Sequence, residues 1–196
     1  MKPIALITGA SSGIGRAIAR QIADHYQLII CGRRTSRLLK LSKKLHDETQ
    51  TLIGSFDVRD QSAVANFIKT LPNKWQNISV LINNAGAYFS KYQKTSENLE
   101  KTFALNHLSY FALTHHLIDI LGLDKPSRVI NVASRAHYQA KLDIDDLQMV
   151  NKYMGWTAYC NSKLMNILFT FEAHRRYKEE NISFNCLHPG FVNTCF

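Results

Sequence analysis

The sequence lacks any apolar run long enough to serve as a signal peptide or to cross a membrane. The first seven residues, from Met1 to Ile7, are apolar for only a few positions, whereas a membrane-spanning helix needs about 20. No later stretch reaches that length. We therefore expect no transmembrane anchor and a cytoplasmic location.

Cysteine and histidine do not form the patterns that metal sites or disulfide frameworks require. The four cysteines are far apart and show neither CxxC nor a Cys/His zinc spacing: Cys31, Cys160, Cys186 and Cys195. No HExxH pattern occurs among the eight histidines. We expect reduced thiols, no metal, and no catalytic duty for His115 and His116, which lie in an apolar helical pattern.

Acidic residues are outnumbered, 15 to 24, which gives a formal charge of +9. Half of the twelve residues at 33–44 are basic, a composition that suits nucleic acid or an anionic membrane surface. However, Leu38, Leu41 and Leu45 recur there at helical spacing, as in a solvated helix with one buried stripe. We expect no nucleic-acid partner, and membrane association rests on charge alone.

No internal repeat, low-complexity tract or linker interrupts the 196 residues, so we expect a single domain over 1–196. Apolar, β-branched runs predict strands at 4–8, 28–31, 51–56, 78–83, 128–132 and 182–187. Helical periodicity predicts helices between them, at 14–25, 36–47, 61–71, 99–121 and 156–179. This alternation predicts an α/β fold with a doubly wound, Rossmann-like parallel sheet of about six strands, helices on both faces, and a ligand crevice beyond the carboxyl ends of the strands.

A glycine-rich turn separates the first predicted strand from the first helix. It contains Gly9, Ser11, Ser12, Gly13, Ile14 and Gly15. Bare glycine backbone can approach a pyrophosphate, and the following helix start supplies N–H donors and a partial positive charge. The alternative is an ordinary glycine turn, but the position between strand and helix favours a dinucleotide site.

No carboxylate follows the second strand, where an Asp or Glu would bind a ribose 2′-hydroxyl. Arg33 and Arg34 stand there instead. Two guanidinium groups favour a 2′-phosphate because Arg offers planar, charged donors. We therefore predict NADP rather than NAD, with Arg33 as the leading contact and Arg34 as the second. The alternative is a pair of solvent-facing arginines at a helix start.

Small and polar residues follow the next three strands. Asp57 and Val58 are candidates for an adenine contact, although Asp57 is equally suited to cap a helix. Asn84, Ala85 and Gly86 suit the close passage of a cofactor ribose, or alternatively form an Asx-type turn. Ser134 follows the fifth strand, so its hydroxyl is expected to face the same crevice.

Tyr159 and Lys163 form a YxxxK pair on one face of a predicted helix. A phenol with a pKa of about 10 is a poor base at neutral pH, and a nearby ammonium favours its phenolate. We therefore predict that Lys163 lowers the pKa of Tyr159 and that its other donors bind ribose hydroxyls. The alternative is a surface helix pair.

Taken in order, these motifs resemble the classical short-chain dehydrogenase/reductase family along essentially the whole chain. The matching segments are TGxxxGIG at 8–15, NNAG at 83–86, Asn106, Ser134, YxxxK at 159–163 and PGxxxT at 189–194. Within the family, the retinol dehydrogenase-type branch is the most similar. It is indicated by the residues at 134–137, the long gap to Tyr159, the Asp-Leu pair at 146–147 and the residues at 162–164 and 187–190.

The resemblance implies an NADP-dependent oxidoreductase that acts on an alcohol/carbonyl pair, with an apolar substrate. It assigns proton transfer to Tyr159, orientation of the substrate oxygen to Ser134, ribose binding to Lys163 and a water-linked proton relay to Asn106. It also implies cofactor contacts from Pro189, Gly190, Val192 and Thr194, for which a turn after the last strand is the alternative. In the family, the helices at 99–121 and 156–179 commonly pair in a homodimer.

The sequence departs from this pattern at its ends. It stops at Phe196, whereas family members usually continue through a substrate-covering segment, another helix and a seventh strand, and it lacks the amino-terminal hydrophobic anchor of membrane-bound retinol-type enzymes. We therefore expect an uncovered sheet edge at 182–187. The alternative function is a truncated cofactor-binding protein with little or no turnover, serving an interaction or regulatory role.

Overall fold

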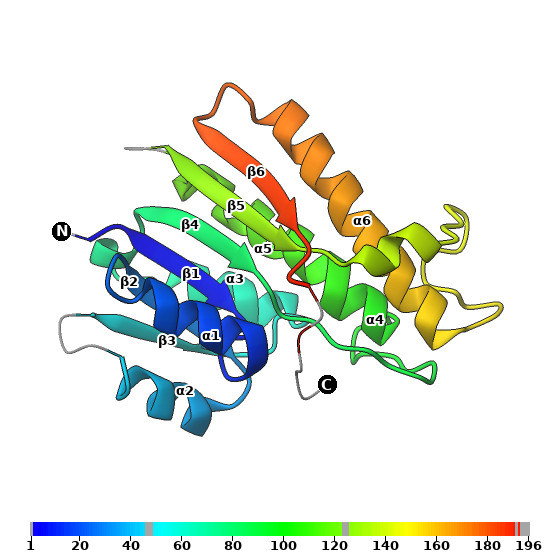
Figure 1. Cartoon of the computed structure of the whole chain (residues 1–196), viewed down its shortest axis with the longest axis horizontal. Coiled ribbons are helices and arrows are strands. Elements are labelled where there is room, and N and C mark those ends of the chain that lie inside the picture. Colours follow the sequence, from blue (N-terminus) through cyan, green and yellow to red (C-terminus); the bar gives the residue numbers. More distant parts are fainter. Residues whose placement is uncertain (1, 46–48, 123–125, 191, 193–196) are drawn as a thin grey trace.

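The computed structural model describes residues 2–45, 49–122, 126–190 and 192. Its centre is one six-stranded parallel sheet in the order β3-β2-β1-β4-β5-β6 (Figure 1). The strands are β1 (Ile4–Thr8), β2 (Gln27–Gly32), β3 (Thr51–Ser55), β4 (Ile78–Asn83), β5 (Ser127–Val132) and β6 (Ile182–Leu187). The predicted doubly wound α/β fold is confirmed, and the bounds of β1, β4 and β6 are those expected from the apolar runs.

Helices cover both faces of the sheet because the central strands are apolar on both sides. All five residues of β1 are buried. Ala5 and Ile7 belong to the core under α1 (Gly13–Ile22) and α2 (Thr35–Ser42). Leu6, on the opposite face, belongs to the core under α3 (Gln61–Lys69), α5 (Ser109–Leu117) and α6 (Gly155–Arg176). Figure 1 shows α1 and α2 in front of the sheet and α5 behind it.

The strand order reverses at β1, which pairs with β2 on one side and β4 on the other. At such a switch point the chains leaving neighbouring strands turn to opposite faces, which opens a crevice at the carboxyl ends. The glycine turn after β1 and the Asn84–Gly86 turn after β4 both lie at this point. The fold therefore places the predicted dinucleotide motifs next to each other.

The predicted helix at 99–121 is present over residues 101–120, but it is not a regular α-helix. The chain forms α4 (Lys101–Phe103), a π-helical stretch (Ala104–Leu108), α5, and a 3₁₀ turn (Ile118–Ile120). Buried Glu100 caps the start of α4, and the π-helical stretch contains Asn106, which hydrogen-bonds to Ala87 outside the helix. Apolar periodicity predicts a regular helix and carries no information about such a long-range hydrogen bond.

Other boundaries differ by a few residues, as helix ends do. α1 and α2 end at Ile22 and Ser42, before the predicted 25 and 47, and residues 46–48 lie outside the described part of the chain. Within the described ranges β6 is the outermost strand on its side. Among these same residues no helix is long and apolar enough to span a bilayer.

Candidate active site

The glycine turn after β1 contains glycines that no other residue could replace without strain. Gly9 and Gly13 have φ values of +69° and +52°. A Cβ added to Gly15 would lie 2.5 Å from Asn84 Nδ2 and 2.6 Å from the Gly9 carbonyl oxygen. The glycines therefore allow α1 and the turn after β4 to pack directly against the end of β1.

Thr8 and Asn84 hold the two turns together. The Thr8 hydroxyl accepts hydrogen bonds from the backbone N–H of Asn84 (2.9 Å) and of Ala85 (3.0 Å). In return, Asn84 Nδ2 donates to the Thr8 carbonyl oxygen at 2.8 Å. Asn84 thus bonds across the crevice rather than forming only a local Asx-type turn. Thr8 was not predicted as a site residue, although its position directly before the first glycine marks it.

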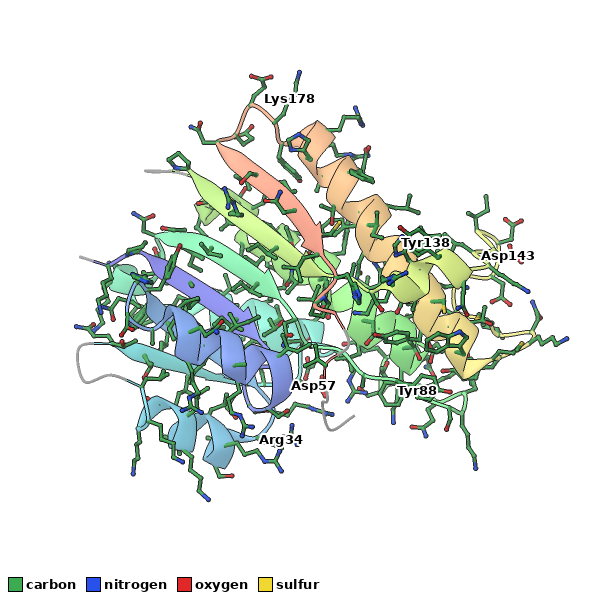
Figure 2. All side chains as sticks on the ribbon, in the orientation of Figure 1. Arg34, Asp57, Tyr88, Tyr138, Asp143 and Lys178 are labelled. Carbon is green, nitrogen blue, oxygen red and sulfur yellow. The ribbon has the colours of Figure 1, made fainter. Side chains whose placement is uncertain are left out.

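A first cavity, here called the glycine-turn cavity, lies between these turns and the ends of β2 and β3. Its lining includes Gly9, Ser11, Ser12, Gly13, Ile14, Gly32, Arg33, Arg34, Asp57, Val58, Asn84, Ala85 and Gly86. The structure therefore brings together the predicted glycine turn, arginines and ribose turn. Figure 2 labels Arg34 and Asp57 at this cavity.

The two arginines have different partners. Arg34 Nη2 donates to the hydroxyl oxygens of Ser12 (2.9 Å) and Ser11 (3.3 Å), next to the glycine turn. Arg33 lies 3.7 Å from the Asp57 carboxylate and keeps 61% of its side chain exposed. Arg34 is thus the guanidinium held against the glycine turn, whereas we predicted Arg33 as the leading contact.

Asp57 is neither a free carboxylate nor a helix cap. Its two carboxylate oxygens accept from Arg59 Nε at 3.0 Å and from Arg59 Nη2 at 2.6 Å. Burial acts to raise the pKa of Asp57, but the Arg59 hydrogen bonds and charge lower it below its usual value. The alternative that Asp57 caps a helix is wrong, because Asp60 caps α3 by accepting from the Ala63 N–H.

A second cavity, here called the Tyr159 cavity, contains the predicted catalytic side chains. Ser134, Tyr159 and Lys163 line it together with Ile14, Asn84, Gly86, Val132, Ala133, His188, Pro189, Gly190 and Val192. Ile14, Asn84 and Gly86 also line the glycine-turn cavity, so the two adjoin. His188 was not predicted, and Thr194 lies outside the described residues.

Tyr159 lies on α6, among other aromatic rings. Its ring centre is 5.8 Å from that of Trp156 and 6.4 Å from that of Tyr88. Burial raises the pKa of Tyr159, and the hydrogen bond with the Ser134 hydroxyl lowers it only in part, so that the pKa stays above its usual value. Ser134 also accepts from the Ala136 N–H at the start of the 3₁₀ helix Arg135–Gln139.

Lys163 is buried and donates from Nζ to the Val132 carbonyl oxygen at 2.9 Å. Nζ lies 5.6 Å from the centre of the Tyr159 ring. Burial lowers the pKa of Lys163 to about 8. The predicted lowering of the Tyr159 pKa by Lys163 is not found, since the hydrogen bond with Ser134 is the interaction that lowers it.

Asn106 is fully buried behind Gly86 and connects three segments. Its side chain accepts from the Ala87 N–H and donates to the Ala87 carbonyl oxygen, both at 2.9 Å. Nδ2 also lies 3.2 Å from Ser162 Oγ, which in turn donates to the Tyr159 carbonyl oxygen at 2.7 Å. Asn106 thus joins the turn after β4 to the helix that carries Tyr159.

This arrangement is suited to a dinucleotide and an oxygen-bearing substrate. The glycine turn leaves backbone exposed at a helix start, the arginines supply positive charge, and two hydroxyl groups meet beside a buried amine. In the described part of the chain no three His, Cys, Asp or Glu side chains are grouped to hold a metal ion, and Cys31, Cys160 and Cys186 are free.

Comparisons with known proteins point in the same direction. The family model described as "short chain dehydrogenase" matches residues 3–196. Retinol dehydrogenase 11 of Homo sapiens is 34% identical over 195 residues, which cover 97% of this chain and 61% of that protein. The chain thus spans about three-fifths of the length of this curated relative.

Two solved structures share the fold. An uncharacterized protein from Mycobacterium paratuberculosis superposes with a TM-score of 0.86 at 33% identity, covering 96% of this chain and 68% of that chain. A metagenomic short-chain oxidoreductase in complex with NADP superposes with a TM-score of 0.79 at 21% identity, covering 96% and 82%. At this lower identity, the second match shows the fold alone.

Proposed function

The chain belongs to the short-chain dehydrogenase family, and from this premise we propose that it is an oxidoreductase for apolar alcohol and carbonyl compounds that uses NADP. The observation that carries the proposal is the Tyr159 cavity. There, Ser134, Tyr159 and Lys163 meet directly beside the glycine-turn cavity.

Each side chain of the cavity has a separate role in this proposal. When bound, NADP supplies or accepts the hydride. Tyr159 gives a proton to the substrate oxygen during reduction and takes it back during oxidation, while the Ser134 hydroxyl orients that oxygen. Lys163 binds ribose hydroxyls. Asn106 connects the turn after β4 to α6, and a water-linked relay would run past it.

The cofactor assignment rests on the glycine-turn cavity. The glycine turn and the start of α1 would bind the pyrophosphate. Asn84, Ala85 and Gly86 would lie along a ribose. Arg33 and Arg34 favour NADP because no carboxylate follows β2 to repel a 2′-phosphate. The backbone at Asp57 and Val58 would border the adenine, and Pro189, Gly190, Val192 and Thr194 would border the nicotinamide.

For the substrate, we assign only a chemical class. The curated relative is named a retinol dehydrogenase, and retinol is an apolar alcohol. Rings of Tyr88 and Trp156 flank Tyr159 and provide apolar surface beside the reacting oxygen. We therefore propose an apolar alcohol or carbonyl substrate, and a homodimer that pairs through α5 and α6.

The test is a titration followed by an assay. NADPH binding is measured by fluorescence, and NADPH oxidation is then followed with a panel of apolar aldehydes and ketones. Tyr159→Phe should preserve binding and abolish turnover, because it removes only the hydroxyl that transfers the proton. Tyr138→Phe, which removes a hydroxyl from an exposed tyrosine, is the matched control. Binding without turnover in the unmodified protein would instead favour a cofactor-binding protein.

A further inference from the structure

Asn161 lies on α6 between Tyr159 and Lys163, and its side chain is only 3% exposed. Its Oδ1 accepts from the Lys141 N–H at 2.8 Å, and its Nδ2 donates to the Lys141 carbonyl oxygen at 3.1 Å. One buried amide thus satisfies both backbone groups of a residue 20 positions away. Such buried and fully paired polar groups fix one arrangement, because breaking them leaves donors and acceptors unsatisfied.

Asn106 makes the same double hydrogen bond with Ala87. Ala87 lies in the segment that leaves β4, and Lys141 lies in the segment that leaves β5. Two of the segments that border the Tyr159 cavity, those that leave β4 and β5, are therefore each held by one buried asparagine from a helix. The proposed reaction already uses Asn106, whereas Asn161 has no role in it.

The segment held by Asn161 has little structure of its own. Between the 3₁₀ helix Arg135–Gln139 and α6 the chain forms neither helix nor strand. Several of its apolar side chains are exposed, among them Ile144 at 79% and Val150 at 64%. A second attachment, the hydrogen bond from Trp156 Nε1 to Gln139 Oε1 at 2.8 Å, is exposed to solvent. Gln148 and Tyr153 attach the later part of the segment to Glu100, Thr102 and Phe89. The Asn161 pairing attaches the start of the segment, at Lys141, to the helix that carries Tyr159.

We propose that Asn161 is a positioning residue: by binding Lys141 it holds the Ser134 segment against α6 and so keeps the Ser134 hydroxyl on Tyr159. The inference rests on the proposed oxidoreductase function. Asn161 itself touches neither substrate nor cofactor in this scheme. Its effect on the reaction passes through the interaction of the Ser134 hydroxyl with Tyr159; both residues line the same cavity.

The proposal predicts a shift in the pH profile as well as a loss of rate. The hydrogen bond with Ser134 lowers the pKa of Tyr159 against burial, which raises it. Losing that bond raises the Tyr159 pKa. In reduction, where Tyr159 must be protonated, the alkaline limb of the pH–kcat profile therefore moves to higher pH, and in oxidation, where Tyr159 must be deprotonated, the acidic limb moves to higher pH. Lys163, Cys160, Tyr88 and Tyr110 also lie near Tyr159 and are unchanged in the variants.

The experiment compares Asn161→Ala with Asn151→Ala in the full chain. Asn151→Ala is the matched control because it removes an exposed side-chain hydrogen bond, to Asp146, from the same segment. For Asn161→Ala we expect kcat to fall about tenfold, within the roughly 10²-fold that a misplacement of 1 Å can cost. We also expect the alkaline limb to shift upward, unchanged NADPH affinity, and faster hydrogen exchange at the Lys141 amide. The control should change none of these.

If Asn161→Ala does not fold, Asn161→Gln keeps the amide and should show the same changes at smaller size. A fall in kcat with an unmoved pH limb, or an unchanged Lys141 exchange rate, would overturn the inference. If the unmodified protein binds NADPH but reduces no carbonyl, the proposed function fails. Hydrogen exchange over residues 135–141 then still decides whether Asn161 holds the segment.

Discussion

At the scale of the residue, the most unusual side chain is Lys163, an amine that is 4% exposed. Burial lowers its pKa to about 8 from 10.5. Between these two pH values the unfolded chain binds more protons than the folded chain, so the contribution of Lys163 to the free energy of unfolding increases as the pH rises. Near neutral pH, the buried charge of Lys163 therefore lowers the free energy of unfolding.

Replacing this amine should remove that pH dependence. We expect the difference in free energy of unfolding between the unmodified protein and Lys163→Met to change by about 3 kcal/mol from pH 7 to 10.5, in favour of the unmodified protein. Chemical denaturation at several pH values measures it. Lys40→Met, at an exposed position of α2, is the control. Its free energy of unfolding should change with pH as that of the unmodified protein does. If the difference in free energy of unfolding between the unmodified protein and Lys163→Met is the same at every pH, this prediction is contradicted.

The two arginines make a second prediction at this scale. Each hydrogen bond to a charged group is worth roughly 1.5–3 kcal/mol, so losing a 2′-phosphate contact should weaken NADPH binding about 10- to 100-fold. Fluorescence titration of Arg34→Ala and Arg33→Ala with both cofactors tests this. We expect a larger loss for NADPH than for NADH, and the variant with the larger loss identifies the main contact. Equal losses for the two cofactors would refute the NADP assignment.

Gly15 provides a third prediction at the residue scale. An added Cβ would meet Asn84 Nδ2 and the Gly9 carbonyl, and overpacking of this kind costs about 1–3 kcal/mol. Gly15→Ala should therefore lower the melting temperature and weaken NADPH binding. Gly32→Ala is the matched control for the melting temperature, because its Cβ would be 3.5 Å from the nearest atom, an ordinary contact; Gly32 lines the glycine-turn cavity, so NADPH binding is not compared with it. Similar losses in both variants would show that the contact with Asn84 is unimportant.

At the scale of the element, the π-helical stretch begins behind an unusual cap. Glu100 is 1% exposed and accepts from the Thr102 N–H (2.8 Å) and the Phe103 N–H (2.7 Å). These are N–H groups of the helix start that would otherwise be buried without partners. The cap therefore fixes where the chain enters the helical region that positions Asn106.

Removing this cap should cost more than removing an exposed one. An N-cap substitution typically costs ~1 kcal/mol, and each buried donor left unsatisfied costs about 1–3 kcal/mol. We expect Glu100→Ala to lose about 2–4 kcal/mol and Asp60→Ala, the exposed cap of α3, to lose ~1 kcal/mol. Urea denaturation compares the two. Equal losses would show that burial of Glu100 adds nothing.

At the scale of the whole molecule, α5 and α6 present an apolar surface. Phe111, Leu168 and Phe171 are 48%, 48% and 67% exposed, and the Phe111 ring lies 5.5 Å from that of Phe169, so that the two helices adjoin. Exposed apolar surface of this kind is typical of association sites. It lies where the proposed homodimer would form.

A charge placed on this surface should prevent dimerisation. We expect Phe171→Glu to sediment as a monomer at concentrations where the unmodified protein is dimeric, because the pairing would bury an unpaired carboxylate. Leu39→Glu changes an equally apolar side chain, 48% exposed on α2, and should leave the dimer intact. A dimer that survives Phe171→Glu would place the interface elsewhere.

What the sequence determined by itself was the architecture and which motifs would lie together at one edge of the sheet. Strand and helix follow from the local spacing of apolar side chains, a property that neighbouring residues carry together. Hence β1, β4 and β6 have the predicted bounds. The motifs at the ends of these strands also pointed to the two cavities, because carboxyl ends of parallel strands meet at one edge of a sheet.

Only the tertiary structure decided how the site residues are paired. Asn106 and Asn161 bind backbone groups 19 and 20 residues away, and burial shifts the pKa of Lys163. Each of these depends on which distant groups fold next to a side chain and on how much water they exclude. Local spacing carries neither kind of information.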